Sequence, residues 1–257
     1  MTMNYPSLCL VTAVDIEYNA AVRLLADPAP GDEGGVRLCR GTRGARRVTV
    51  LKAGMGARGF APRLAAHLDA NPCDALLVAG LAGGLVPELA AGQVVLYDRC
   101  RDVRGSIARE LEPGRDEIAS IVEDDSFLKI VQALLQTAGL AVKRRAGITV
   151  GEIVVSAEKK LQLGVLHRAA AADMETFDIW AVCRDRKLPF AALRVISDEA
   201  GQDLPDFNRA YDREGRVIPH RMATAMAARP AVTARFLLNL RPVMQTFRRA
   251  LQVVLDA

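Results

Sequence analysis

Residues 173–200 carry two acidic side chains at places where an α/β protein binds its ligands. Glu175 precedes a stretch of apolar residues at helical spacing, and Asp198 directly follows the apolar run 190–196, which predicts a buried strand. Both carboxylates would then lie at the sheet edge outside the carboxyl ends of the strands. Packing alone does not explain two carboxylates so placed. We predict that they belong to one catalytic unit.

The rest of the chain alternates strand-like apolar runs with amphipathic helical stretches. The strand-like runs are 8–14, 36–39, 47–52, 75–79, 94–97 and 142–155, and the helical stretches include 127–135 and 158–167. Residues 31–35 are typical of a turn or loop, and the polar stretch 101–125 of a long loop or insertion. We find no repeat or linker, and the alternation predicts a single α/β domain over residues 1–257.

The first strand-like run ends in two further acids, Asp15 and Glu17. Acidic side chains at the start of a helix can cap it and are favoured by its dipole. Capping is one interpretation of Asp15 and a weaker one of Glu17. The alternative is a functional role at the strand end.

Two glycine-rich loops follow strand-like runs. In residues 80–85, small side chains let backbone N–H groups face a ligand, so Ala82 and Gly83 are candidate binding residues. Residues 54–59 match the G-x-G-x-x-G pattern of dinucleotide-binding proteins. The acid that such a site needs after the next strand is missing, because Asp74 precedes that strand. A dinucleotide-dependent oxidoreductase is therefore a minor alternative, and the glycines more readily indicate close backbone approach.

The bulk composition is that of an ordinary globular protein, with 257 residues, 51% hydrophobic and 25% charged. No apolar run is long enough for a membrane helix, and the first run is too short for a signal peptide, so we expect a cytoplasmic location. Five scattered cysteines predict reduced, mostly buried thiols. Because the cysteines show no Cys-x-x-Cys spacing, we expect no metal site. We expect no nucleic-acid binding either, since basic residues are not interleaved with aromatics.

The net charge of +4 belongs to residues 201–257, which hold nine arginines and five acids. Pro230 and Pro242 divide this tail into predicted helical segments with arginines between aliphatic residues. Such helices fit packing against the sheet or another subunit. Contact with a membrane or a lipidic ligand is the alternative.

Several sequence motifs occur in a characteristic order. They are K-A-G-M-G (52–56), A-G-L-A-G-G-L (79–85), A-G-Q-V-V (91–95), A-D-M-E-T (172–176) and L-P-F-A-A-L-R-V-I-S-D-E-A (188–200). Together they resemble the purine nucleoside phosphorylase and nucleosidase superfamily, particularly methylthioadenosine/S-adenosylhomocysteine nucleosidases. The motifs D-L-P (203–205) and 222–242 resemble the hopanoid-associated branch, thought to remove adenine from adenosylhopane. The resemblance implies a mixed central sheet flanked by helices, with extra C-terminal helices over 201–257.

The resemblance implies cleavage of a purine N-glycosidic bond without a metal or organic cofactor. Asp198 matches the general acid that protonates N7 of the base, for which an apolar, dry position would favour the protonated carboxyl. Glu175 matches the acceptor of the ribose hydroxyl groups, and Met174 the thioether packed under the sugar. Ser197 and Arg194 are candidate binding residues. Arg194 could orient the acid or the nucleophile, or could be purely structural.

Glu17 matches the glutamate that activates water in the nucleosidases. A carboxylate in that position repels a phosphate dianion and favours hydrolysis. A phosphorylase with phosphate as co-substrate stays the alternative, because Arg58 and Arg194 could form an anion site. Leu81 stands where many relatives have a serine, so the hydroxyl group that could contact phosphate is missing. This substitution further weakens the phosphorylase hypothesis.

Two expectations about binding remain. The aromatic residue that stacks on the base in related nucleosidases has no counterpart in residues 154–160. The resemblance also implies a homo-oligomer. An alternative of another class is a nucleoside sensor that kept the pocket and lost turnover, although binding alone does not require an acid at Asp198.

Overall fold

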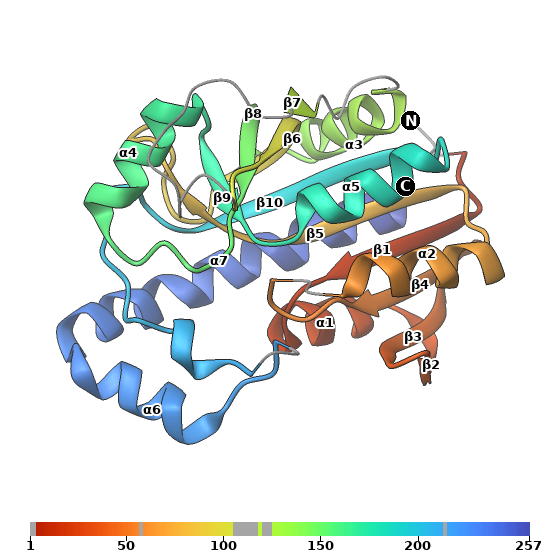
Figure 1. Ribbon diagram of the computed structural model, residues 1–257. Coiled ribbons are helices and arrows are strands. Elements are labelled where there is room, and N and C mark those ends of the chain that lie inside the picture. Colours follow the sequence, from red (N-terminus) through yellow and green to blue (C-terminus); the bar gives the residue numbers. More distant parts are fainter. Residues whose placement is uncertain (1–3, 57–58, 105–117, 120–124, 213–214) are drawn as a thin grey trace.

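The computed structural model describes residues 4–56, 59–104, 118–119, 125–212 and 215–257, and its centre is a mixed ten-stranded sheet flanked by helices (Figure 1). The strands are β1 (Ser7–Thr12), β2 (Ala26–Glu33), β3 (Val36–Arg43), β4 (Arg46–Lys52), β5 (Ala75–Gly84), β6 (Val94–Asp102), β7 (Ile118–Ala119), β8 (Val142–Thr149), β9 (Ala171–Asp173) and β10 (Phe190–Asp198). The helices are α1 (Asp15–Val22), α2 (Phe60–Ala70), α3 (Ser126–Thr137), α4 (Ala157–His167), α5 (Thr176–Asp185), α6 (Pro219–Ala228) and α7 (Pro230–Asp256), with a 3₁₀ turn at Asn208–Ala210. The predicted fold class is confirmed.

Part of the sheet closes on itself. Strand β10 pairs with β5 in parallel and with β6 antiparallel, and β6, β8, β9 and β5 follow in order. Strands β1, β4, β3 and β2 extend the sheet from β5. Because β1, β5 and β10 are parallel neighbours, their carboxyl ends meet at one place.

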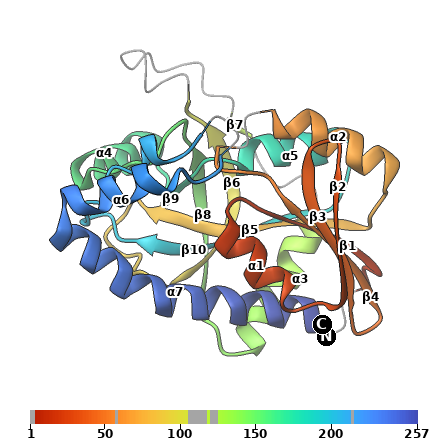
Figure 2. The ribbon, with the colours of Figure 1, turned by 90° about the horizontal axis from the view of Figure 1, so that it is seen from below.

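Both faces of the central strands are buried, which explains their continuous apolar runs. Leu10 and Leu77 belong to the core beneath α1, α3 and α7, whereas their neighbours Val11 and Val78 belong to the core beneath α2 and α5. Figure 2 shows these two helical layers on opposite sides of the sheet. This packing fixes the strand ends that carry the site.

One local prediction was right only in part, and another was wrong. Residues 31–35 were expected in a turn or loop; the turn is confined to Gly34 and Gly35, because β2 runs to Glu33 and pairs antiparallel with β3. The tail was expected to break at Pro242, but α7 continues through it. The proline removes the helix donor for the carbonyl of Leu238, whose turn is exposed, so water can replace that bond. Buried residues beyond the proline, such as Phe247, hold the second half of α7 on the sheet.

The state of the cysteines agrees with the prediction from the sequence. The five cysteines are free thiols and all except Cys73 are fully buried. The long loop expected at 101–125 lies largely outside the described residues. Among the helices that the structure describes, none is long and apolar enough to cross a membrane.

Candidate active site

A cavity of about 420 Å³ opens where strands β1, β5, β9 and β10 end. It is lined by seven of the eight residues predicted from the sequence, namely Glu17, Ala82, Gly83, Met174, Glu175, Ser197 and Asp198. These residues are separated by up to 181 positions along the chain, and the fold brings them to one sheet edge. The exception is Arg194, which lies buried behind the cavity wall.

Glu17 is held in place by backbone donors from two elements. Its Oε1 accepts a hydrogen bond from the Leu81 N–H at 2.8 Å, and its Oε2 accepts from Ala13 at 2.9 Å and Val14 at 3.2 Å. Burial raises the pKa of this carboxyl, and the Leu81 N–H and the charge of Arg194 partly oppose the rise. A buried carboxylate with a raised pKa is a stronger base than one in water.

Of the two acids at the start of α1, Glu17 caps the helix and Asp15 does not. Glu17 does reach back to the N–H of Val14, which precedes the helix, so it supports the helix start and also lines the cavity. Asp15 is half exposed and instead forms ion pairs with Lys52 at 2.6 Å and Arg37 at 3.2 Å. Asp15 therefore belongs to the surface, and Glu17 to the cavity.

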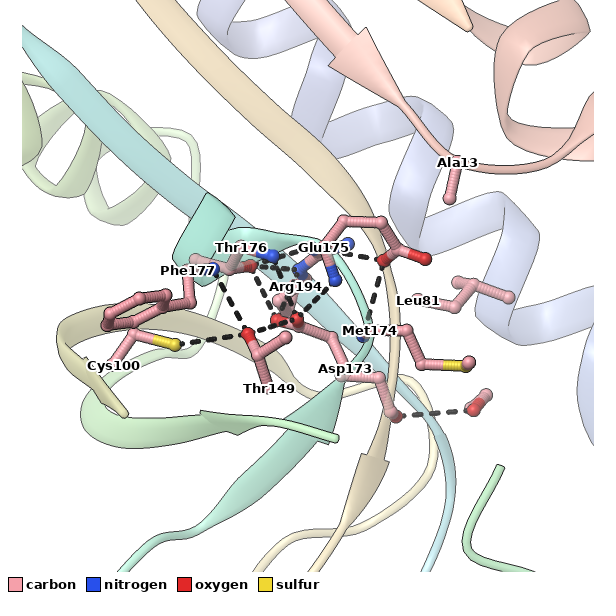
Figure 3. Close-up of polar contacts among 12 residues, drawn as sticks. Ala13, Leu81, Cys100, Thr149, Asp173, Met174, Glu175, Thr176, Phe177 and Arg194 are labelled. Atoms are coloured by element: carbon pink, nitrogen blue, oxygen red, sulfur yellow. Dashed lines mark hydrogen bonds and ion pairs between the residues drawn. The ribbon is translucent and has the colours of Figure 1, made fainter. Parts of the chain in front are cut away.

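A buried polar network holds the junction of β9 and α5 (Figure 3). Asp173 accepts hydrogen bonds from the backbone N–H groups of Glu175 at 3.0 Å and Thr176 at 2.9 Å, which fixes the first turn of α5. Arg194, from β10, is 1% exposed and lies 3.2 Å from Asp173 Oδ2. Its Nη2 donates to Thr176 Oγ1 at 2.7 Å.

The same network orients Glu175 toward the cavity. Its Oε2 lies 3.7 Å from Arg194 Nη2, and its Oε1 accepts a hydrogen bond from the Gly56 N–H at 2.9 Å. Burial raises the pKa of Glu175 to about 7, against the opposing charge of Arg194. Arg194 thus contacts the predicted ribose-binding residue, Glu175.

The glycine-rich loops are explained by close backbone approach. Gly56 has φ +75°, a conformation that side chains disfavour, and a Cβ there would lie 3.3 Å from Met174. At Gly80 a Cβ would lie 2.6 Å from Arg194 Nη1 and 2.9 Å from Glu17 Oε1. Gly56 therefore presents its N–H to a carboxylate of the site, which agrees with close approach and leaves no support for a dinucleotide fingerprint.

Asp198 is buried and has a hydrogen-bond donor at each oxygen. Ser197 Oγ donates to Oδ1 at 2.5 Å, and Lys160 from α4 forms an ion pair with Oδ2. The expectation of an apolar setting was wrong, because Lys160 is itself 1% exposed and stands against the carboxylate. Sequence reasoning missed Lys160. The available signal was its spacing with Leu163, Gly164 and His167, which together form the buried face of α4.

The tail closes the cavity from outside the sheet. Its lining residues are Leu204, Phe207, Tyr211, Val217, Met222, Met226, Phe236, Leu237 and Leu240. The rings of Phe207 and Phe236 pack with their centroids 5.5 Å apart. Aromatic side chains thus reach the cavity from the tail and not from residues 154–160.

The predicted anion site is only partly described. Arg58 lies outside the described residues, and Arg194 is engaged by Asp173, Glu175 and Thr176. Of the described residues that line the cavity, Lys160 alone carries a positive charge, and it is paired with Asp198. Within the same described part of the chain, no group of three or more His, Cys, Asp or Glu side chains is placed to hold a metal ion.

Comparisons with known proteins agree with this fold. The phosphorylase superfamily matches residues 7–227. A 5′-methylthioadenosine/S-adenosylhomocysteine nucleosidase of Shewanella sediminis is 24% identical over 213 residues, covering 80% of this chain and 92% of that protein. One of Tolumonas auensis is 27% identical over 183 residues, covering 69% and 79%.

Solved structures share the fold at low sequence identity. Futalosine hydrolase of Helicobacter pylori superposes with a TM-score of 0.74 at 18% identity, covering 97% of each chain. The 5′-methylthioadenosine/S-adenosylhomocysteine nucleosidase of Colwellia psychrerythraea, in complex with adenine, gives 0.72 at 17% identity, covering 99% of this chain and 97% of that one. The chain belongs to the phosphorylase superfamily, and its resemblance to the nucleosidases of that superfamily is confirmed.

Proposed function

We propose that this protein is a purine nucleosidase that hydrolyses the N-glycosidic bond of an adenosine-type nucleoside. Four buried carboxylates line one cavity, and this observation carries the proposal. Asp173 is paired with Arg194, and the other three are Glu17, Glu175 and Asp198. The sequence relatives that are nucleosidases support it. Binding alone would not require three buried acids, each of which costs free energy to desolvate.

The three carboxylates divide the chemistry among them. As the bond breaks, the purine gains electrons and the ribose gains positive charge, so catalysis requires protonation of the base and stabilisation of the sugar. Asp198 donates its proton to N7 of the purine. Glu175 accepts hydrogen bonds from the ribose hydroxyl groups beside Met174, and Glu17 takes a proton from the attacking water.

Hydrolysis is favoured over phosphorolysis by the charges around Glu17. A phosphate dianion in this place would meet the carboxylate, whose oxygens accept from Leu81, Ala13 and Val14. The described cation nearest the catalytic acid, Lys160, is already paired. Leu81 also offers no hydroxyl group to an anion. A phosphate-dependent phosphorylase remains the second candidate, supported by the superfamily match.

We further propose that the 5′ substituent of the nucleoside is large and apolar, as in adenosylhopane. The tail places apolar side chains such as Met226, Phe236 and Leu240 around the outer part of the cavity. Leu237 and Leu238 are exposed on α7, near Arg235 and Arg241, so these helices could approach a lipidic substrate in a membrane. A cytoplasmic homo-oligomer without a cofactor is the corresponding prediction for the protein as a whole.

A purine-release assay tests these proposals together. The protein is incubated with methylthioadenosine, S-adenosylhomocysteine, adenosine and a 5′-alkyl adenosine, with and without phosphate, and free adenine is followed by chromatography. Release without phosphate is expected, fastest for the alkyl compound. Release that requires phosphate would establish the phosphorylase. Absence of release from all four would refute the nucleosidase, and unchanged ligand affinity in D198N would then favour a sensor.

A further inference from the structure

Lys160 is a buried cation with every donor engaged. Its ammonium group donates to Asp198 Oδ2, to the Gln202 carbonyl at 2.6 Å and to the Glu199 carbonyl at 3.3 Å. An ammonium group has three N–H donors, and a neutral amine has two. Three acceptors around one buried nitrogen therefore favour the charged form, so that Lys160 is a fixed positive charge beside Asp198.

The position of this charge is set by the start of α4. Ser156 caps the helix by accepting a hydrogen bond from the Lys159 N–H at 3.3 Å. Asp203 accepts another from the Ala157 N–H at 3.0 Å, and the Leu204 N–H donates to the Val155 carbonyl at 2.9 Å. These bonds tie α4 to the segment that follows β10. Lys160 then completes the connection from inside.

We propose that Lys160 is a positioning residue for the catalytic acid, an inference that rests on the nucleosidase function proposed above. Its ammonium group holds the Asp198 carboxyl and the backbone of residues 199–202 in the orientation required by the base. It also stabilises the carboxylate that remains after the proton has left. Such stabilisation is greater after proton transfer than before it, which is the condition for lowering a barrier.

The reaction step starts after the Asp198 carboxylate has taken up a proton from water, with Glu17 ionised. The bond from C1′ of the ribose to N9 of the purine breaks, and its electron pair passes to the purine. The Asp198 carboxyl gives its proton to N7 and becomes a carboxylate paired with the Lys160 ammonium. The water oxygen bonds to C1′, and its proton passes to Glu17. Lys160 itself neither gains nor loses a proton.

The test compares two leaving groups in K160M, which keeps much of the side-chain length without the charge. Methylthioadenosine carries a purine that must be protonated, whereas p-nitrophenyl β-D-ribofuranoside releases a phenolate that is stable without a proton. We expect kcat for methylthioadenosine to fall about 100-fold with KM changed less than about threefold, the lower range for general acid catalysis. Hydrolysis of the nitrophenyl riboside should change less than about threefold.

K159M is the matched control, because Lys159 is its neighbour on α4 and pairs with Glu152 at the surface. It should match the wild type on both substrates. If K160M does not fold, K160Q, which keeps two N–H donors, should show the same selective loss of kcat. Equal losses on both substrates, a change confined to KM, or unchanged kcat would overturn the proposal. A wild type that hydrolyses neither nucleoside nor riboside would instead refute the nucleosidase function.

Discussion

Replacing Glu17 with glutamine tests the reaction class and the local hydrogen bonding at once. All three described partners of this carboxylate are N–H donors, from Leu81, Ala13 and Val14. A carboxylate accepts at both oxygens, whereas an amide has one oxygen and one NH₂ group. Whichever way the glutamine turns, its NH₂ group faces at least one N–H donor. The substitution therefore removes the base and creates an unsatisfied buried contact.

The two effects have different magnitudes and separate readouts. Loss of one buried hydrogen bond with a donor left unsatisfied costs about 1–3 kcal/mol of unfolding free energy. For a chain of this size that corresponds to a Tm lowered by roughly 2–4 °C per kcal/mol. Loss of a general base lowers kcat by about 10²–10⁴-fold. KM should change little, because Glu17 is assigned to the water and Glu175 to the sugar.

The assay measures adenine release at saturating nucleoside, together with thermal unfolding of the same preparation. D15N is the matched control, since Asp15 lies two residues away on α1, is itself half exposed and does not line the cavity. It should leave kcat within about twofold. If E17Q kept more than half of the wild-type kcat, Glu17 would not activate the water. An unchanged Tm would refute the argument that the glutamine NH₂ group faces an unsatisfied backbone N–H donor.

Three further predictions concern the cavity. Burial raises the pKa of Glu175 from 4.5 to about 7 in the folded protein, so the folded state binds more protons at this group than the unfolded state does. The contribution of Glu175 to stability should therefore fall as the pH rises from about 4.5 to 7. The Tm of the wild type relative to that of E175Q should decline across this pH range, and a constant difference would contradict the raised pKa. G80A should lower the Tm and reduce kcat more than about 100-fold, because a Cβ would lie 2.6 Å from Arg194, whereas G201A, with no atom within 4 Å of its Cβ, should match wild type in both measurements. F236A should lower kcat/KM for a 5′-alkyl adenosine by about 10-fold or more, and kcat/KM for adenosine by less than about threefold. Equal losses for the two substrates would show that Phe236 does not contact the 5′ substituent.

The sequence predicted the sheet edge well because strand ends and carboxylates leave local signals. Asp198 ends a strand that is apolar except for Arg194 and Ser197, and β10 is buried on both faces. Glu175 stands between a short strand and a helix, and the structure places both groups on one cavity. The histidines were less readable. A histidine in an amphipathic helix is expected at the surface, but His67 and His167 are both buried, since each shares the core-facing side of its helix with apolar residues.

The tail could not be placed from the sequence because its contacts are long-range. Phe236 and Leu240 line the cavity from the first half of α7, before the part of the helix that packs on the sheet, and their spacing is equally typical of packing against a subunit. The break expected at Pro242 also hid that α7 is one helix. A local rule on proline was overridden by the burial of Val243, Met244 and Phe247 beyond it.

The setting of Asp198 shows why site residues are easier to find than the groups that tune them. An apolar run before an acid predicts burial, and Asp198 is buried. Burial alone favours the neutral form of a carboxyl group, whereas an adjacent cation favours the carboxylate. Lys160, 38 positions earlier in the chain, places such a cation beside Asp198. Lys160 lies among polar neighbours in the sequence, and only the turn of α4 directs it inward. The chemistry of the acid therefore depends on a helix that its own motif does not contain.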